Sequence, residues 1–117
     1  MIQTLSLVAL GGAAGSVLRH LAVQAVGSPL GTLLVNVAGS FVIGILFVML
    51  AGRDAFALLF MAGLLGGFTT FSAFSLDALK LWQAGQGGQA LLYVGASVGL
   101  SLLAVGVGAA LARGVLA

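Results

Sequence analysis

Residues 63–75 read GLLGGFTTFSAFS and lie inside a long apolar stretch. The glycine pair at 66–67 and the β-branched Thr69 and Thr70 disfavour a continuous helix, because glycine carries an entropic cost and threonine loses rotamer freedom there. We therefore predict a break near residues 66–70. Non-helical backbone at membrane depth must be surrounded by protein or a water-filled cavity. Carbonyls freed at the end of a half-helix are good ligands for a hard cation such as Na⁺.

The composition around this stretch is that of a membrane protein. Of the 117 residues, 62% are hydrophobic and 5% are charged, which lies outside the range of soluble globular domains. A helix needs about 20 apolar residues to cross the hydrocarbon core, and the sequence predicts four such helices, at about residues 4–26, 30–51, 55–82 and 90–112. We expect an all-α membrane protein with one transmembrane domain, residues 1–117, and a break in its third helix.

The charged residues are few and scattered, and the basic ones are Arg19, Arg53, Lys80 and Arg113. They form no basic patch for nucleic acid, and the lack of cysteine excludes thiolate chemistry. Four crossings place Arg53 and Arg113 on one side of the membrane and Arg19 and Lys80 on the other. Because basic residues set orientation, this balance predicts that the chain inserts both ways up.

Glycine is abundant, with 19 residues. Gly11 with Gly15, and Gly95 with Gly99, have the small-residue spacing that lets helices touch directly in lipid. Packing within one bundle is the simpler interpretation of any single pair. Together they favour a compact, oligomeric bundle.

Two polar stripes run at helical spacing through apolar segments. One consists of Thr32, Asn36 and Ser40, and the other of Tyr93, Ser97 and Ser101. Hydroxyls and the Asn36 amide can donate hydrogen bonds to an anion. A single hydroxyl more often bonds to its own helix, so the case rests on the two aligned stripes. Membrane-buried acids or histidines typify cation pathways, but the only acids are Asp54 and Asp77, and we expect His20 near the interface beside Arg19.

Phe71 and Phe74 lie three residues apart and share a helix face. Their spacing fits ordinary packing aromatics. It also fits a site in which the positive edges of the rings meet an anion.

Three stretches together resemble the small bacterial fluoride channels called Fluc or CrcB-type proteins. They are GGAAGSVLR at 11–19, GTLLVNVAGSF at 31–41 and GGFTTFSAF at 66–74. The resemblance implies an antiparallel, dual-topology homodimer in the bacterial inner membrane. It also implies passive export of cytoplasmic fluoride through two pores, without enzymatic activity.

The resemblance also assigns roles to residues. Asn36, Phe71 and Phe74 would line the pore, with Ser72 and Thr32 as further candidates, and the fourth helix would contribute a polar track of Tyr93, Ser97 and Ser101. A structural Na⁺ at the dimer interface would be held by the backbone carbonyls of Gly66 and Thr69. Arg19 would lie near a pore vestibule. Asp77 stands where family members can carry glutamate, and its role stays open.

Two other classes of protein share some of these features. A small multidrug exporter is also a four-helix dual-topology dimer, but it needs a buried glutamate in its first helix, and this sequence has none. A structural membrane subunit would explain the glycines and the hydrophobicity. It gives no reason for aligned hydrogen-bond donors beside a helix break.

Overall fold

The computed structural model describes residues 1–116, and all the regular structure in that range is helical. Its elements are α1 (Ile2–Val26), α2 (Leu30–Met49), α3 (Asp54–Ala57), the π-helical η1 (Leu58–Leu65), α4 (Gly66–Phe68), α5 (Phe71–Gln83) and α6 (Gly87–Leu116). The segment from α3 to α5 forms one crossing, interrupted only at Thr69 and Thr70. Four stretches are long and apolar enough to cross a membrane. The predicted multi-pass all-α fold with a broken third helix is confirmed.

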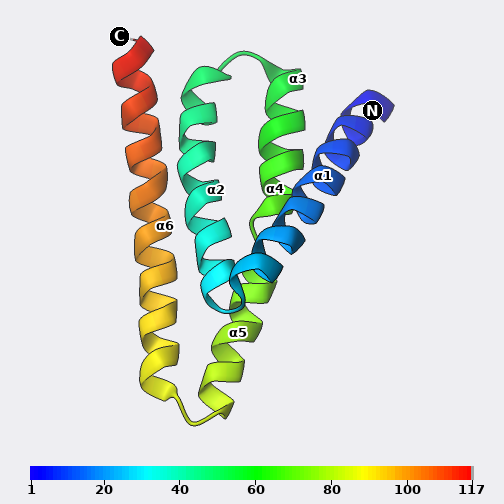
Figure 1. Ribbon diagram of the computed structural model, residues 1–117. Coiled ribbons are helices and arrows are strands. Elements are labelled where there is room, and N and C mark those ends of the chain that lie inside the picture. Colours follow the sequence, from blue (N-terminus) through cyan, green and yellow to red (C-terminus); the bar gives the residue numbers. More distant parts are fainter. Residues whose placement is uncertain (117) are drawn as a thin grey trace.

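The crossings alternate in direction, so both ends of the chain and the α2–α3 connection lie at one end of the molecule, and the α5–α6 connection lies at the other (Figure 1). Helices α2 and α6 pack side by side and run in the same direction. Helix α1 crosses the third crossing obliquely and packs on η1 and α4. The break therefore lies between α1 on one side and the α2–α6 pair on the other.

Helix α1 meets the third crossing backbone to backbone. Gly11 and Gly15 are buried, and a Cβ at Gly15 would clash with the Leu64 carbonyl oxygen. From the other side, a Cβ at Gly67 would lie 2.5 Å from the Gly12 oxygen and 3.1 Å from Ser16 N. Glycine on both helices permits this approach, as in other membrane helix pairs, and the approach holds α1 against the segment just before the break.

Glycine also sets the contact between α2 and α6. A Cβ at Gly44 would clash with the Val105 carbonyl oxygen, and a Cβ at Gly108 would clash with that of Phe41. Gly95 and Gly99, the second pair predicted from the sequence, have no neighbour within 4 Å of a Cβ in the chain. That pair makes no close helix contact within the subunit.

The helix ends differ from the predicted bounds by a few residues. Helix α6 extends beyond 90–112 at both ends because hydrogen-bonded turns continue into polar flanks that hydropathy does not count. Helix α2 ends earlier than residue 51, because Arg53 N bonds to the Leu50 oxygen at 2.9 Å and turns the chain. The break falls on Thr69 and Thr70, whereas the glycine pair at 66–67 stays helical.

The close approach of α1 predicts that Gly15→Ala destabilises the bundle. The added methyl group must push two backbones apart, which costs about 1–3 kcal/mol for overpacking. Gly114→Ala is the control, because a Cβ there meets nothing within 4 Å. Thermal unfolding in detergent measures both variants, and equal unfolding temperatures would contradict the packing described here.

Candidate functional site

The two residues of the break are extended. Thr69 has φ −85° and ψ 157°, and Thr70 has φ −152° and ψ 123°. The Thr69 hydroxyl donates to the Leu65 oxygen at 3.0 Å, which closes the end of α4. The Thr70 hydroxyl oxygen accepts from Ala73 N at 3.1 Å and caps the start of α5, a role that threonine fills well. Thr70 thus satisfies one amide freed at the start of α5, whereas the Leu65 oxygen also accepts from Thr69 N at 3.0 Å.

Asn36 on α2 holds the backbone of Thr70 from the side. Its Oδ1 accepts from Thr70 N at 2.7 Å, and its Nδ2 donates to the Thr70 oxygen at 2.9 Å. In a continuous α-helix Thr70 N would instead donate to the Gly66 oxygen. Asn36 Oδ1 therefore replaces the helical acceptor of Thr70 N, and one Nδ2 hydrogen remains for which residues 1–116 supply no acceptor.

Arg19 on α1 reaches the opposite side of the break. Its Nη1 donates to the Gly67 oxygen at 2.9 Å and lies 3.4 Å from the Thr69 oxygen. The sequence predicted this arginine near a pore vestibule, and the structure places its guanidinium at the backbone carbonyls of the break.

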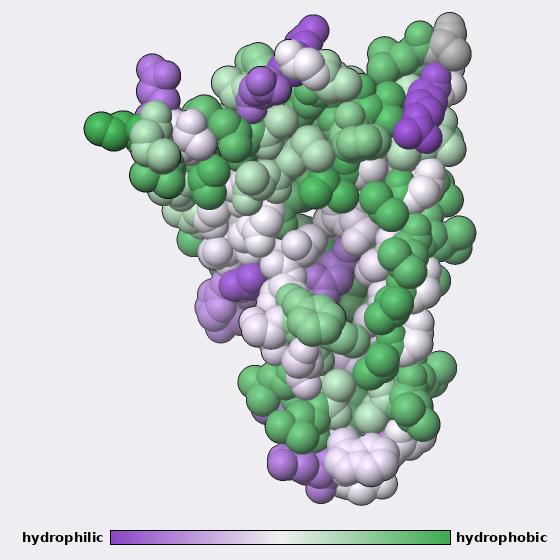
Figure 2. All heavy atoms as spheres, turned by 180° about the vertical axis from the view of Figure 1, so that it is seen from behind, coloured by the Kyte–Doolittle hydropathy of each residue, from purple (hydrophilic) through white to green (hydrophobic). Residues whose placement is uncertain are grey.

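An open pocket of about 250 Å³ lies beside the break, between α2, α5 and α6. The face seen in Figure 2 is hollowed at mid-height, and hydrophilic residues lie in the hollow between largely hydrophobic surfaces. The pocket brings together residues of both predicted stripes and of the break, namely Asn36, Ser40, Thr69, Thr70, Phe71, Phe74, Ser97, Val98 and Ser101.

Ser97 is the most informative member of this pocket. Its side chain is only 5% exposed, and within residues 1–116 its hydroxyl has no hydrogen-bond partner. A buried hydroxyl without a partner costs about 1–3 kcal/mol, and such groups in native structures call for an explanation. Rotation of the side chain toward the pocket that Ser97 lines would let its hydroxyl donate to a ligand that accepts a hydrogen bond there.

Three aromatic rings form a row that begins at the pocket, which Phe71 and Phe74 line. The centroids of Phe71 and Phe74 are 5.5 Å apart with planes at 51°, and those of Phe74 and Tyr93 are 5.3 Å apart at 42°. Tilted pairs of this kind point ring edges toward neighbouring groups. Phe74 is 7% exposed, whereas Phe71 is 77% exposed, so Phe71 has an unpartnered face in the isolated subunit.

The row ends at a buried carboxylate. The Tyr93 hydroxyl donates to Asp77 Oδ2 at 3.2 Å, and Asp77 is 7% exposed. The hydroxyl of Tyr93 is therefore engaged by the acid, and Tyr93, although predicted as a pore residue, does not line the pocket. The sequence left the role of Asp77 open, and the structure makes it the hydrogen-bond acceptor of Tyr93.

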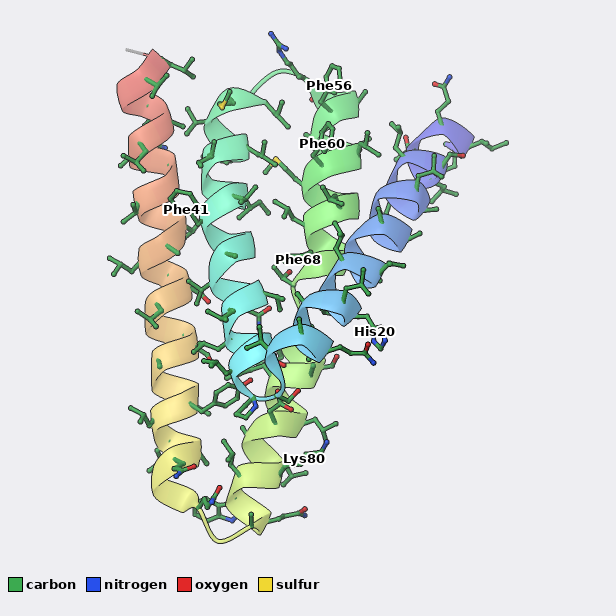
Figure 3. The ribbon with its side chains drawn as sticks, in the orientation of Figure 1. His20, Phe41, Phe56, Phe60, Phe68 and Lys80 are labelled. Carbon is green, nitrogen blue, oxygen red and sulfur yellow. The ribbon has the colours of Figure 1, made fainter. Side chains whose placement is uncertain are left out.

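Some predicted residues lie outside the pocket. Thr32 is 1% exposed and does not line it, and the Ser72 hydroxyl lies 3.3 Å from that of Thr70. Their role in a pore stays a prediction. His20 points away from the other helices on the outer side of α1 (Figure 3).

Three lining residues were absent from the predicted site, namely Ser40, Thr70 and the apolar Val98. Ser40 lies one turn after Asn36 on the same face of α2, and its place in the stripe was a usable signal. Thr70 stands immediately before α5, where threonine is a common helix cap, but its contact with Asn36 depends on tertiary structure.

A family profile and several individual relatives place the chain in the same protein family. The sequence profile described as CrcB-like protein, Camphor Resistance (CrcB), matches residues 6–109. A protein of Cereibacter sphaeroides named fluoride-specific ion channel FluC is 52% identical, with 97% of this chain and 98% of the relative covered. Proteins with the same name from Chelativorans sp. (52% identical, 96% and 98% covered) and Ruegeria sp. (48%, 99% and 99%) are similarly related.

These matches run through all four crossings and through the break that shapes the pocket. The chain belongs to the CrcB-like family.

Proposed function

We propose that the chain forms a fluoride-selective channel in the bacterial inner membrane, which releases cytoplasmic fluoride by passive electrodiffusion. The name shared by its relatives supports the choice of ion. The observation in this chain that carries the proposal is the buried Ser97 hydroxyl, which lines the pocket without a partner. Passive conduction needs no energy source and no chemical step, so we expect no enzymatic activity.

Fluoride would exchange water for fixed donors along the pocket. The hydroxyls of Ser97 and Ser101 and the remaining Nδ2 hydrogen of Asn36 can donate to it, and the ring edges of Phe71 and Phe74 offer partial positive charge. The polar track of α6 runs through Tyr93, Ser97 and Ser101, with Tyr93 held by Asp77. Donors fixed for a small anion disfavour larger halides, in line with how pores select ions.

The isolated subunit supports a dimer, because its polar pocket is open on one side. Polar groups facing hydrocarbon are costly, and the ring of Phe71 beside them is 77% exposed. A second copy in the opposite orientation would cover both. Outside the break the basic residues are Arg53 and Arg113 at one end and Lys80 at the other, a small bias that permits that orientation. A two-fold antiparallel dimer would contain two equivalent pores.

The break also fits a structural Na⁺. The Gly66 oxygen has lost its helical donor, because Thr70 N bonds to Asn36, and Gly66 is exposed on the subunit surface. Carbonyl oxygens freed at the end of a half-helix, such as those of Gly66 and Thr69, are suitable ligands for this hard cation. A bound Na⁺ would link the broken helices of two subunits electrostatically.

Flux measurements test the proposed ion. Liposomes that contain the purified protein should release fluoride rapidly and chloride negligibly, as measured with ion-selective electrodes. Equal rates for both ions would reject selectivity. Proton-coupled export of an organic cation without fluoride flux would favour the multidrug exporter, and no flux from an intact dimer would favour a structural subunit.

Ser97→Ala tests the role of the unpartnered hydroxyl. Hydrogen bonds to a charged group are worth about 1.5–3 kcal/mol, so fluoride efflux should fall roughly tenfold or more while the dimer stays intact. Ser75→Ala is the matched control, because Ser75 is exposed and donates to its own helix at the Phe71 oxygen. Equal losses in both variants would contradict a specific contact with Ser97.

Reporter fusions test dual topology. A C-terminal green fluorescent protein, which is fluorescent in the cytoplasm, and a C-terminal alkaline phosphatase, which is active outside it, should both give signals. Ala51→Lys adds a charge beside Arg53, in the α2–α3 connection, and should shift the population toward the orientation with this end in the cytoplasm. A wild-type chain that gives only one signal would contradict the antiparallel dimer.

A further inference from the structure

The position of Arg19 follows from the glycine contact of α1. Gly15 fixes α1 against the Leu64 backbone, and Arg19 lies one helical turn later on the same face. The side chain is half-buried and its Nη1 reaches the Gly67 and Thr69 oxygens. The arginine is therefore held at the break by the packing of its own helix.

The carbonyls that it contacts are those left without amide donors. In a continuous helix Phe71 N would donate to the Gly67 oxygen and Ala73 N to the Thr69 oxygen. Ala73 N instead donates to the Thr70 hydroxyl oxygen. The C-terminal end of a helix also carries partial negative charge, so a guanidinium is suited to this end of the half-helix both as a donor and as a cation.

We propose that Arg19 is a resident cation of the helix break that shares the Thr69 carbonyl with the structural Na⁺. This inference rests on the Na⁺ site of the proposed function. Arg19 stabilises the break when Na⁺ is scarce, and its positive charge lowers the affinity of the neighbouring carbonyls for Na⁺. Each cation therefore partly substitutes for the other, and Arg19 acts as a positioning residue for the pocket on the far side of the break.

Measuring how Na⁺ changes the thermal unfolding of Arg19→Gln tests whether Arg19 and Na⁺ share the Thr69 carbonyl. Protein purified without Na⁺ is titrated with NaCl at constant ionic strength, and its thermal unfolding temperature is measured. Without Na⁺ the variant should unfold at a lower temperature than the wild type. Its half-saturating Na⁺ concentration should be roughly tenfold lower, because a positive charge a few ångströms from the site is gone.

Two further variants separate charge from other effects. Arg19→Lys keeps the charge and should keep the wild-type half-saturating concentration to within about twofold, although it loses the planar fork. Arg53→Gln removes an exposed arginine from the α2–α3 connection and should change nothing. A wild-type midpoint in Arg19→Gln, a shift in Arg19→Lys equal to that in Arg19→Gln, or an Arg19→Gln chain that stays unfolded even at high Na⁺ would each overturn the proposal.

The result for the wild type distinguishes a failure of the Arg19 role from a failure of the proposed Na⁺ site. If Na⁺ does not raise the unfolding temperature of the wild-type protein, the proposed Na⁺ site fails and the sharing of its carbonyl fails with it. If Na⁺ stabilises the wild type and Arg19→Gln alike, only the role of Arg19 is overturned. Fluoride efflux from liposomes decides the channel function independently of both.

Discussion

The need to satisfy backbone groups at membrane depth governs this structure. The two extended threonines remove helical hydrogen bonds where neither lipid nor bulk water can replace them. Asn36 and Arg19, from two other crossings, supply bonds to the exposed backbone of the break. A broken third helix thus requires a polar residue on each neighbouring helix, and this requirement places an amide and a guanidinium in the middle of an apolar bundle.

The side chains of Asn36 and Arg19 reach the break only because the helices approach closely. Glycine at positions 11 and 15 of α1 and at 67 beyond η1 brings two backbones into contact, and the arginine then spans the short remaining distance to the break. Gly39 on α2 likewise permits a close approach to the break, since a Cβ there would clash with the Thr69 side chain. The small residues are therefore part of the site, although they carry no chemistry of their own.

Hydropathy was enough to predict four crossings, and the residues at 66–70 were enough to predict a break in the third. The exact residues of the break were not predictable, because Gly66 and Gly67 stay helical. The absence of a side chain at Gly67 lets α1 pack closely there instead. Helical spacing identified both polar stripes, but it could not show that Thr32 is buried away from the pocket. The contact of Arg19 with carbonyls 48 and 50 residues away depends on tertiary packing alone.

A single break creates two poles of opposite sign. The carbonyl end of α4 is partly negative and the amide end of α5 is partly positive, and the two extended residues separate them. Arg19 lies at the carbonyl end, whereas Thr70 and Phe71, at the amide end, line the pocket with the Ser97 hydroxyl. Carbonyl oxygens and amide hydrogens can therefore lie a few residues apart without pairing, because the negative end of one half-helix is followed by the positive end of the next. An uninterrupted third helix would pair the carbonyls of its first half with the amides of its second half and remove both poles.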